Sequence, residues 1–383
     1  MRKLCLLGAS GSIGKQTLDV INKNRDDFTL VSISIGHQTR KISPTIKRFP
    51  TIKSVCVLSK DKCKEYQKKY PHIKFYYGDE GLLSLINDDV DMVVNALVGF
   101  VGLKPTLYAL EQNKIVCLAN KEALVVGGEL VNKLLSEGKG TLYPIDSEHS
   151  ALKKCLMVDD QNVDKLVLTA SGGAFRNLSR EQLKNVKKED ALKHPNWKMG
   201  DKITIDCATM VNKAFEIIEA HYLFGYPYEK INVKLHDESY VHSYVQYEDG
   251  LLRLDISKPD MRNPIKLALY EFNIPFNTKV VATLDSLKKF HFHDFDIKRY
   301  PVVKYAEKVI KEKGGYGATF NAANEVAVRA FLNDEIPFLM IEGIIDKCMA
   351  NYKNEKNINY DKLVEIDAKI RQIARKMIED RRK

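Results

Sequence analysis

The chain has 383 residues, 44% hydrophobic and 29% charged, which is typical of a soluble globular protein with two or three domains. Its seven cysteines are odd in number, scattered and without a C-x-x-C pair, which argues against a disulfide framework and a thiolate zinc site. The net charge is +10, and the lysines responsible are spread through nearly every segment. The sequence has no nucleic-acid recognition motif, so we expect small phosphorylated ligands and no nucleic acid.

Membrane insertion is also not expected. No apolar run reaches the roughly 18 to 20 residues needed to span a bilayer. The first residues, MRKLCLLGASGSIG, lead directly into a strand and a glycine turn, which leaves no room for a signal or transit peptide. The expected location is therefore cytoplasmic, or an organelle if a transit peptide has been trimmed.

The N-terminal part reads as an α/β domain over residues 1–145. Short apolar runs at 3–7, 29–35, 54–58, 91–97 and 115–119 alternate with helical or polar stretches. This spacing predicts a Rossmann-like, doubly wound parallel sheet with helices on both faces.

The glycine turn GASGSIG, residues 8–14, follows the first strand and opens a helix, where a doubly wound fold binds a pyrophosphate. Its glycines are spaced three apart, unlike the usual G-x-G-x-x-G, and a tight turn that binds nothing is the alternative. If the turn binds a dinucleotide, the contacts come from Gly8, Ala9, Ser10, Gly11, Ser12 and Ile13.

The end of the second strand indicates which dinucleotide. The segment SIGHQTRK contains Gly36, His37 and Arg40 and no acid that would bind a ribose 2′-hydroxyl. Cationic groups suit a 2′-phosphate, so the sequence favours NADPH over NADH; the alternative is that these are solvated loop charges.

Two further segments place polar residues after predicted strands. LANKEALV puts Asn120, Lys121 and Glu122 at the carboxyl end of a strand, where open α/β sheets bind ligands, although an ordinary polar turn is equally possible. YPIDSEHSA places Asp146 and Glu148 two residues apart, and in an extended backbone they project to the same side. They form a candidate cation site, unless they lie in an exposed turn.

Residues 146–285 read as a central α+β catalytic domain. LVLTASGG, KITIDCATM, KINVKL, YVHSYVQY and LLRLDIS are predicted strands, and residues 209–222 are a predicted helix. In TASGGAFR, Ser171 and the two glycines after it could line an anion nest or form a simple turn. Residues 286–300 are a predicted linker, and periodicity at 302–313, 321–333, 337–351 and 359–381 predicts a C-terminal helical bundle over 301–383.

The helix within DCATMVNKAFEIIEAHYLF brings together Asn212, Lys213 and Glu216 on one side, near its start. The plain interpretation is a surface ion pair between Lys213 and Glu216. The functional interpretation is that Asn212 and Lys213 contact a phosphate, while Glu216 joins the two earlier carboxylates around Mg²⁺ or Mn²⁺.

Taken together, these segments carry a resemblance. GASGSIG, LANKE, PIDSEHSA, TASGGAF, HPNWKMG, DCATMVNKAFE, PDMRNPI and FNAANEVAV occur in this order, and the chain resembles the 1-deoxy-D-xylulose 5-phosphate reductoisomerases. The resemblance implies NADPH, a divalent cation (Mg²⁺, Mn²⁺ or Co²⁺) and a homodimer.

The same resemblance implies residue roles. Asp146, Glu148 and Glu216 are implied as metal ligands, with Lys121 counted among the catalytic residues because it binds substrate oxygens. Implied substrate contacts are Ser147, Ser171, His194, Trp197, Cys207, Asn212 and Lys213. HPNWKMG, residues 194–200, matches a mobile flap whose Trp197 covers the substrate, and Met199 and Gly200 are expected on the cofactor side. From the residues alone, Trp197 is equally well explained as a packing anchor. His242 and Met261 lie either near the nicotinamide or in the core.

Two positions depart from the family pattern. Cys207 stands where a serine usually contacts the phosphate, and a thiol is a weaker hydrogen-bond donor than a hydroxyl. The sequence HDES, residues 236–239, replaces H-P-Q-S.

The implied reaction is rearrangement and reduction of 1-deoxy-D-xylulose 5-phosphate to 2-C-methyl-D-erythritol 4-phosphate, with a metal ion as Lewis acid and NADPH as hydride donor. The alternatives are a metal-independent dehydrogenase of the semialdehyde or homoserine type, which leaves the three carboxylates without a purpose, and a catalytically silent NADP-binding sensor.

Overall fold

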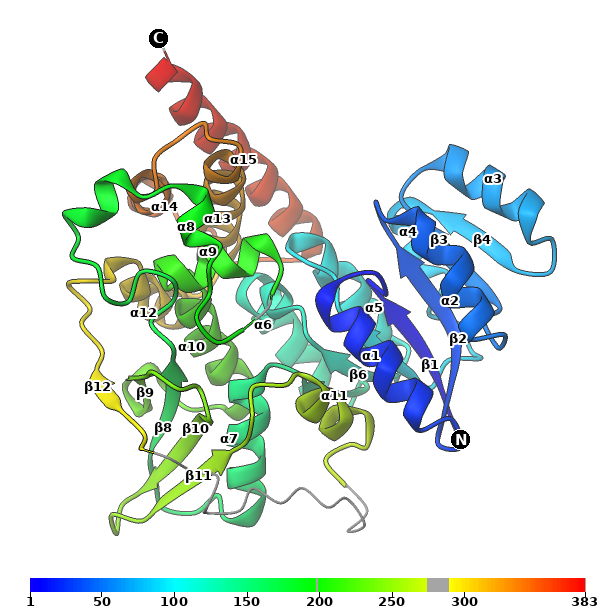
Figure 1. Ribbon diagram of the computed structural model, residues 1–383, viewed down its shortest axis with the longest axis horizontal. Helices are drawn as coiled ribbons and strands as arrows, with labels where there is room; N and C mark the ends of the chain where they lie inside the picture. The colour runs from blue at the N-terminus through cyan, green and yellow to red at the C-terminus, as the bar shows by residue number, and fades with distance from the viewer. Residues whose placement is uncertain (198, 274–288, 383) are drawn as a thin grey trace. The chain divides into compact units, whose positions relative to one another are not determined.

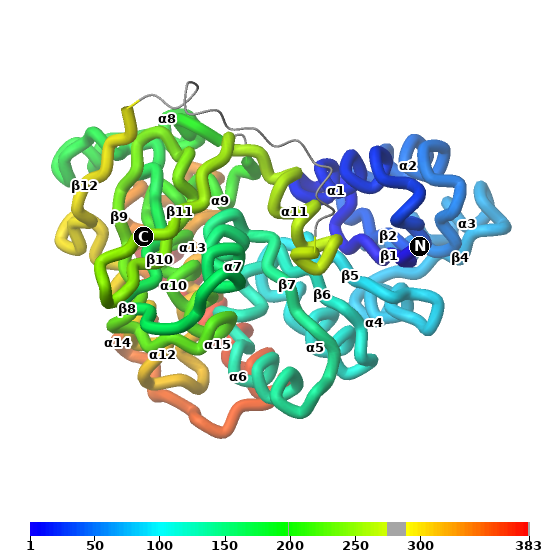
Figure 2. The backbone as a smooth tube through the Cα atoms, turned by 90° about the horizontal axis from the view of Figure 1, so that it is seen from below, coloured from blue at the N-terminus to red at the C-terminus, as the bar shows by residue number. Residues whose placement is uncertain are grey.

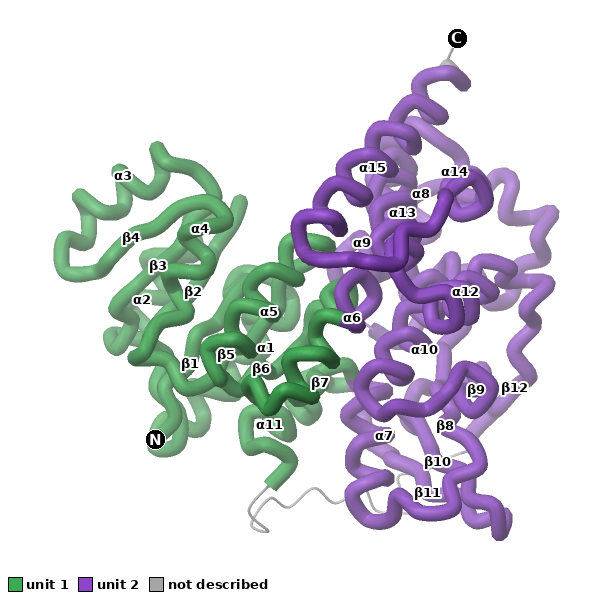
Figure 3. The backbone as a smooth tube through the Cα atoms, turned by 180° about the vertical axis from the view of Figure 1, so that it is seen from behind, with its two compact units in different colours: residues 1–123, 130–146, 260–274 green, residues 124–129, 147–259, 275–383 purple. Residues whose placement is uncertain are grey.

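The structure is a computed structural model that describes residues 1–197, 199–273 and 289–382. Its internal contacts divide the chain into two compact units (Figure 3). Unit 1 comprises residues 1–123, 130–146 and 260–274, and unit 2 comprises residues 124–129, 147–259 and 275–383. The four-part domain division expected from the sequence stays a prediction, and its boundary between residues 285 and 286 lies outside the described residues.

A seven-stranded sheet forms the centre of unit 1, in the order β4-β3-β2-β1-β5-β6-β7. All neighbouring strands are parallel. The order reverses between β1 and β5, and open α/β sheets bind ligands beyond the carboxyl ends of strands at such a switch point. The strands are β1 (Arg2–Leu7), β2 (Phe28–Ile35), β3 (Ser54–Val57), β4 (Lys74–Tyr77), β5 (Met92–Asn95), β6 (Ile115–Leu118) and β7 (Thr141–Pro144).

The five predicted strands of this sheet are confirmed, and the structure adds β4 and β7 at its two edges. Each edge strand has a single buried residue, whereas the equally short β3, β5 and β6 are buried over three or four residues, so the apolar signal of β4 and β7 is weaker. The helices of unit 1 are α1 (Ser12–Lys23), α2 (Ile42–Arg48), α3 (Lys60–Lys69), α4 (Gly78–Leu83), α5 (Leu103–Glu111), α6 (Lys121–Ser136) and α11 (Arg262–Leu269), with 3₁₀ turns η1 (Thr39–Lys41) and η2 (Phe100–Gly102). The middle of α6, residues 124–129, is grouped with unit 2.

Helix α11 joins unit 1 although it lies far along the chain. It packs against α1 (Figure 2) and contacts β6 and β7. Its Ile265 and Ala268 side chains are fully buried in the same core as Leu4, Ile33 and Val94. The hydrophobic core of the N-terminal sheet is therefore completed by a distant segment.

Unit 2 contains a second, mixed sheet in the order β11-β10-β8-β9-β12. Strands β8 and β9 are parallel, and the other pairs are antiparallel. The strands are β8 (Val163–Ala170), β9 (Ile231–His236), β10 (Val241–Tyr247), β11 (Leu252–Ile256) and β12 (Phe292–Asp294). Strand β12 lies in a segment expected to be a loop, so that expectation is wrong for these three residues.

The predicted strand KITIDCATM is also wrong, because residues Asp201–Thr209 form helix α9. Its β-branched residues favour a strand locally. The helix is instead stabilised by tertiary contacts: Lys202 pairs with Asp206 one turn later at 2.7 Å, and the buried Asn324 donates to Asp206 at 2.8 Å. Tertiary packing has overridden the local preference.

The remaining elements of unit 2 are helical. The helix predicted at 209–222 is confirmed as α10 (Val211–Phe224), and Met210, at φ +64°, joins it to α9. The C-terminal helices are confirmed as α12 to α15, with α13 packed against both α14 and α15 (Figure 1). The remaining bounds are α7 (Ser147–Val158), α8 (Lys188–Ala191), α12 (Lys304–Glu312), α13 (Tyr316–Leu332), α14 (Leu339–Asn351), α15 (Tyr360–Arg382), η3 (Gln182–Asn185), η4 (Tyr228–Lys230) and η6 (Pro301–Val303). No helix among the described residues is long and apolar enough to cross a membrane.

Candidate active site

The glycine turn after β1 lies at the switch point of the unit 1 sheet and is shaped by close backbone packing. Gly8 has φ +83°, and a Cβ atom there would lie 2.5 Å from the Ala96 carbonyl oxygen. A Cβ atom on Gly14 would lie 2.2 Å from the Gly8 oxygen. The Gly8 N–H donates to Ser34 Oγ at 2.8 Å. Glycine is therefore required at both positions, and the turn leads into the N-terminus of the 12-residue helix α1, where a phosphate can bind.

The segment after β2 remains exposed. Gly36, His37 and Arg40 are all solvent-accessible, and no ion pair of Arg40 occurs within the part of the chain that the structure describes. These cationic side chains follow β2, which pairs directly with β1. The arrangement is compatible with recognition of a 2′-phosphate.

Asn120 organises the loops at the same edge of the sheet. Its Oδ1 accepts the Ala123 N–H at 3.0 Å and caps α6, while its Nδ2 donates to the Gly99 oxygen and to Glu122 Oε2, each at 3.0 Å. The residue is fully buried, and a Cβ atom on Gly102 would lie 2.2 Å from its Oδ1. The Asn120 side chain therefore fixes the loop after β5 and orients Glu122.

Lys121 and Asp146 form an ion pair in unit 1. Lys121 Nζ donates to Asp146 Oδ2 at 2.6 Å, and the two side chains are only 8% and 11% exposed. Lys121 is the first residue of α6, and Asp146 follows the end of β7. Both predicted site residues thus lie at the carboxyl edge of the sheet.

The D-S-E segment is not extended as the sequence analysis assumed. Helix α7 begins at Ser147, so Asp146 precedes the helix and Glu148 lies in its first turn. The prediction that the two acids project to the same side of an extended strand is therefore wrong. Asp146 is nevertheless the residue directly before the helix that carries Glu148. An acid in the first turn is favoured because the helix dipole is positive there.

In unit 2, Lys213 lies between two carboxylates. Its Nζ donates to Glu148 Oε1 at 3.2 Å, to Glu216 Oε2, and to the carbonyl oxygen of Thr169. Glu216 also accepts from Asn212 Nδ2. Lys213 is 3% exposed and Glu216 is 1% exposed. The predicted juxtaposition of Asn212, Lys213 and Glu216 on α10 is confirmed, and the surface-pair interpretation is wrong because the group is buried.

This carboxylate pair fits a metal ion. Glu148 and Glu216 offer oxygen atoms that lie within 4.8 Å of one another. They already accommodate one cationic group, the Lys213 ammonium, between them. Hard carboxylate oxygens are the ligands that Mg²⁺ and Mn²⁺ prefer. The third predicted ligand, Asp146, directly precedes α7, the helix that carries Glu148.

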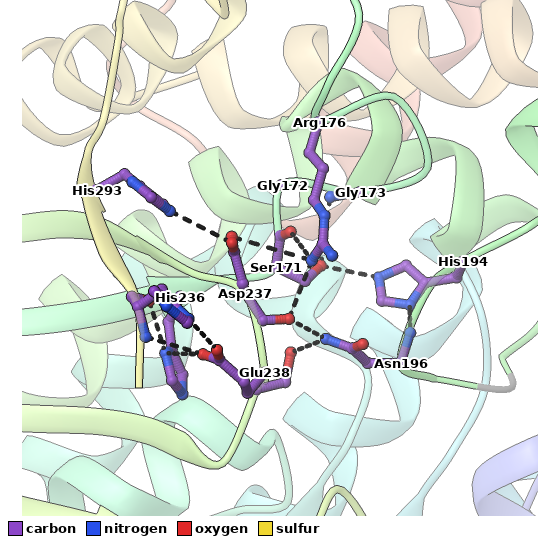
Figure 4. A network of polar contacts seen from close by, with 12 residues as sticks. Ser171, Gly172, Gly173, Arg176, His194, Asn196, His236, Asp237, Glu238 and His293 are labelled. Carbon is purple, nitrogen blue, oxygen red and sulfur yellow. Dashed lines mark hydrogen bonds and ion pairs between the residues drawn. The ribbon is translucent and has the colours of Figure 1, made fainter. Parts of the chain in front are cut away.

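A second glycine turn follows β8. Gly172 and Gly173 have φ values of +83° and +69°, and the Gly173 N–H donates to Ser171 Oγ at 3.3 Å. Ser171 Oγ also lies 3.0 Å from His194 Nε2 (Figure 4). The hydroxyl is thus held at the edge of the turn by groups from two segments.

His194 has a defined tautomer. Its Nδ1 accepts the N–H groups of Asn196 at 3.2 Å and Trp197 at 3.0 Å, so the ring proton is on Nε2 and points to Ser171. Burial, followed by the nearby Arg176 guanidinium, lowers the pKa of His194 to about 4. Since Ser171 Oγ accepts from both Nε2 and Gly173, its own O–H remains able to donate to a ligand oxygen.

Arg176 and Asn196 form a link beside the second glycine turn that the sequence analysis did not single out. Arg176 Nη1 donates to the Asp237 oxygen at 2.9 Å, and Asn196 Nδ2 donates to the same oxygen at 2.7 Å. Figure 4 shows both side chains pointing toward the Asp237 backbone, Arg176 from above and Asn196 from the right. An arginine close behind a glycine pair, and an asparagine two residues after a histidine, are the only sequence signals for this link.

The HDES segment that departs from the family pattern holds β12 in place. Glu238 contacts His291, with Oε1 2.5 Å from Nδ1, and Asp237 Oδ2 lies 3.3 Å from His293 Nε2. The buried His236 accepts the Val241 N–H at 3.1 Å and stacks on Phe292. The substituted acids therefore pair with histidines of the neighbouring strand.

The flap segment contacts the unit 2 sheet through Trp197. Its ring centroid lies 6.0 Å from that of His242, which is 6% exposed. Met199 is half-buried and Gly200 caps α9, while Lys198, within the same segment, lies outside the described residues. Met261 belongs to unit 1 and packs at the margin of its core.

Cys207 lies on α9 beside the second glycine turn. A Cβ atom on Gly173 would lie 2.6 Å from the Cys207 carbonyl oxygen, so the two backbones are in contact. The thiol is partly exposed rather than buried. That Cys207 contacts the substrate phosphate stays a prediction.

The predicted site residues fall into two groups. Unit 1 carries Gly8, Ala9, Ser10, Gly11, Ser12, Ile13, Gly36, His37, Arg40, Asn120, Lys121, Glu122 and Asp146, and unit 2 carries Ser147, Glu148, Ser171, His194, Trp197, Met199, Gly200, Cys207, Asn212, Lys213 and Glu216.

Family profiles match most of the chain. Residues 4–128 match the profile described as 1-deoxy-D-xylulose 5-phosphate reductoisomerase. Residues 142–224 and 256–373 match two profiles described as C-terminal domains of the same enzyme.

Individual proteins agree with the profiles. The 1-deoxy-D-xylulose 5-phosphate reductoisomerase of Bacillus subtilis (strain 168) is 45% identical over 372 residues, covering 96% of this chain and 97% of its own. That of Geobacillus kaustophilus (strain HTA426) is 44% identical over 383 residues, covering 99% and 100%. A crystal structure of DOX-P reductoisomerase in complex with NADPH, fosmidomycin and magnesium has a TM-score of 0.92 at 33% identity, covering 99% and 98%. The Zymomonas mobilis enzyme in complex with NADPH has a TM-score of 0.90 at 34% identity, covering 99% of each chain.

Proposed function

The chain belongs to the 1-deoxy-D-xylulose 5-phosphate reductoisomerase family, and from this premise we infer that it converts 1-deoxy-D-xylulose 5-phosphate into 2-C-methyl-D-erythritol 4-phosphate. It does so with NADPH and a divalent metal ion, in the synthesis of isoprenoid precursors. The observation that carries the inference is the buried cluster on α10, where Lys213 and Glu216 meet Glu148.

Asp146, Glu148 and Glu216 hold the metal ion in this proposal. A bound divalent ion supplies Lewis-acid polarisation of substrate oxygen atoms. Lys121, buried beside Asp146, presents an ammonium group to the same oxygens. The carboxylates bring negative charge into a buried site, which makes a cation there favourable.

The phosphate group of the substrate binds where unit 2 offers converging donors. Ser171 has an O–H available because two neighbouring N–H groups already bond to its oxygen. Asn212 and Lys213 lie in the first turn of α10, and a helix N-terminus favours an anion. His194, neutral near pH 7, orients Ser171 and adds no charge.

NADPH binds along the glycine turn after β1, with Arg40 near the 2′-phosphate. The cofactor supplies the hydride, and the protein supplies position and exclusion of water. Trp197, on the flap, covers the substrate. A homodimer, a cytoplasmic location, acceptance of Mn²⁺ or Co²⁺, and the four-part domain division are also proposals, supported by the family resemblance and the sequence pattern.

The decisive experiment follows NADPH absorbance at 340 nm after addition of 1-deoxy-D-xylulose 5-phosphate and Mg²⁺. We expect turnover that chelation of the metal abolishes. Glu216→Gln should lower kcat by orders of magnitude while the circular dichroism spectrum and NADPH binding stay unchanged. Glu307→Gln, a partly exposed acid of the same unit, is the matched control and should retain full activity. Equal turnover with and without metal would instead favour a metal-independent dehydrogenase.

A further inference from the structure

Both lysines assigned to the substrate are paired with carboxylates assigned to the metal. In unit 2, the Lys213 ammonium contacts Glu148 and Glu216. In unit 1, Lys121 contacts Asp146 at 2.6 Å. A lysine ammonium that is bonded to these carboxylates is not available to the substrate. The ion pairs must therefore break before the lysines can bind the substrate.

We propose that Lys213 is an exchangeable internal cation: it neutralises Glu148 and Glu216 until a divalent ion binds them, and the ion then releases it to the substrate phosphate. Metal and phosphate therefore bind with positive coupling. The proposal rests on the proposed function, and it adds an order of events and a thermodynamic link that the assignment of residues alone does not contain.

Electrostatics require an exchange. Glu148 and Glu216 have oxygens within 4.8 Å of one another, and Glu216 is 1% exposed. Two such carboxylates need a cation, because repulsion between like charges is poorly screened in a buried site. A divalent ion bound to the same oxygens would lie within a few ångströms of the ammonium. The charge of a divalent ion equals the combined charge of the two carboxylates with opposite sign. Its repulsion of the ammonium therefore offsets the attraction of the carboxylates, and Lys213 leaves those oxygens when the ion binds.

The structure also provides a pivot for the released lysine. Lys213 Nζ donates to the carbonyl oxygen of Thr169, and Thr169 precedes Ser171 by two residues at the end of β8. The ammonium can keep this bond while it turns from the carboxylates toward the phosphate turn. A lysine side chain has a flexible stem and three donors, which suits such an exchange.

Thermodynamic reciprocity makes the proposal measurable. If a metal ion frees Lys213 for phosphate, then phosphate must raise the affinity for the metal by the same factor. A variant without the Lys213 ammonium has lost the internal cation that competes with the metal for Glu148 and Glu216 in this pairing. It should therefore bind metal more tightly in the absence of phosphate, and lose the coupling.

The test measures the Kd for Mn²⁺ by electron paramagnetic resonance, with and without saturating glycerol 3-phosphate, using glycerol as the reference. For the wild type we expect glycerol 3-phosphate to tighten Mn²⁺ binding at least fivefold. Lys213→Gln should bind Mn²⁺ alone at least tenfold more tightly than the wild type and show no change with glycerol 3-phosphate. Lys213→Arg keeps the charge and should bind Mn²⁺ alone as weakly as the wild type.

Lys154→Gln is the matched control. Lys154 lies on α7, the helix that also carries Glu148, and its ammonium pairs with Asp255 of β11. The substitution should leave both Kd values unchanged. Lys213→Met replaces the glutamine variant if thermal unfolding shows that the latter is not folded. The exchange is overturned if the uncharged variant binds Mn²⁺ no more tightly than the wild type, or if its coupling to glycerol 3-phosphate persists.

A Glu216→Gln arm separates this failure from failure of the proposed function. Wild type and Glu216→Gln with equal Mn²⁺ affinity would contradict the metal assignment itself. Loss of Mn²⁺ binding in Glu216→Gln together with unchanged binding in Lys213→Gln would leave the assignment intact and reject only the exchange.

Discussion

The two glycine turns of this protein, after β1 in unit 1 and after β8 in unit 2, are built differently. The first is shaped mainly by backbone packing: Gly8 and Gly14 are so close to other backbone atoms that no side chain fits, and Ser34 Oγ accepts the Gly8 N–H. The second also has a backbone-packed glycine, Gly173, but it depends in addition on side chains from distant segments, with Ser171 held by His194 and Arg176 bonded to the Asp237 backbone.

The difference shows which kind of site a sequence reveals. A backbone-built turn depends on glycines at fixed spacing, so it can be recognised within seven residues. A side-chain-built turn depends on residues brought together by the fold, and its pattern S-G-G looks like any loop. Substitutions in the two turns should therefore have different signatures, in stability for the first and in substrate affinity for the second.

The largest effect is expected for Gly14→Ala. The added Cβ atom would lie 2.2 Å from the Gly8 oxygen and 2.7 Å from Ala9 Cα, so the backbone has to move. We expect the free energy of unfolding to fall by roughly 1–3 kcal/mol and NADPH binding to be lost. Gly11→Ala is the control, because its Cβ atom would meet nothing closer than 3.4 Å. Equal thermal unfolding curves for the two variants would contradict the backbone-packing account.

Ser171→Ala tests the second turn. It removes a hydroxyl that can donate to a dianionic phosphate, and a hydrogen bond to a charged group is worth about 1.5–3 kcal/mol. We expect KM for the substrate to rise by roughly ten- to a hundredfold, with NADPH affinity and thermal stability little changed. Ser34→Ala is the counterpart in the first turn, since Ser34 Oγ accepts the Gly8 N–H. It should change NADPH affinity and leave the substrate KM alone.

Arg40→Ala tests whether a side chain supplements the backbone-built turn. Arg40 is exposed after β2, so its contribution to a 2′-phosphate is screened by solvent. We expect kcat/KM with NADPH to fall about tenfold at low salt and kcat/KM with NADH to stay the same. A matching loss with NADH would show that Arg40 does not recognise the 2′-phosphate.

Cys207→Ser should have a smaller effect of opposite sign. The Cys207 backbone contacts Gly173 of the second turn. A serine hydroxyl is a stronger donor and should lower the substrate KM roughly two- to tenfold, equivalent to about 0.5–1.5 kcal/mol. A thiol-alkylating reagent should inactivate the wild type, and bound substrate should protect it. Unchanged KM together with no protection would place the thiol away from the phosphate.

A further effect is expected in the pH dependence of stability. The pKa of His194 is lowered to about 4 by burial and by Arg176, whereas an unfolded histidine titrates near 6.5. Between these values the unfolded state binds the extra proton, so stability should decrease as the pH falls from about 6.5 to 4. His194→Gln should flatten this part of a plot of Tm against pH. An unchanged slope would mean that His194 is protonated in the folded protein.

Sequence reasoning predicted best what lies on one regular element. Asn212, Lys213 and Glu216 share a helix, so their spacing alone placed them together, and α10 confirms it. The same reasoning could not give their burial, or that Lys213 would contact Glu148 from another helix.

Sequence reasoning failed where tertiary contacts decide. The β-branched residues of α9 favour a strand, but the buried Asn324, from α13, bonds to Asp206 and stabilises the helix. The extended reading of Asp146 and Glu148 failed because α7 begins between them. Arg176 and Asn196 were missed because their shared partner is a backbone oxygen of Asp237, which no side-chain pattern encodes.

The position of α11 has a consequence for how the protein is made. Strands β1 to β7 are all complete by Pro144, but the core that they form also needs Ile265 and Ala268, and Ala268 further accepts a hydrogen bond from the Cys117 thiol at 3.4 Å. A ribosome releases the sheet well before it releases this helix. Part of the apolar surface of the nascent sheet therefore stays exposed while residues 145–261 are synthesised, and such a surface is prone to aggregation. The N-terminal cofactor-binding unit, first in sequence, is thus among the later parts of the chain to finish folding.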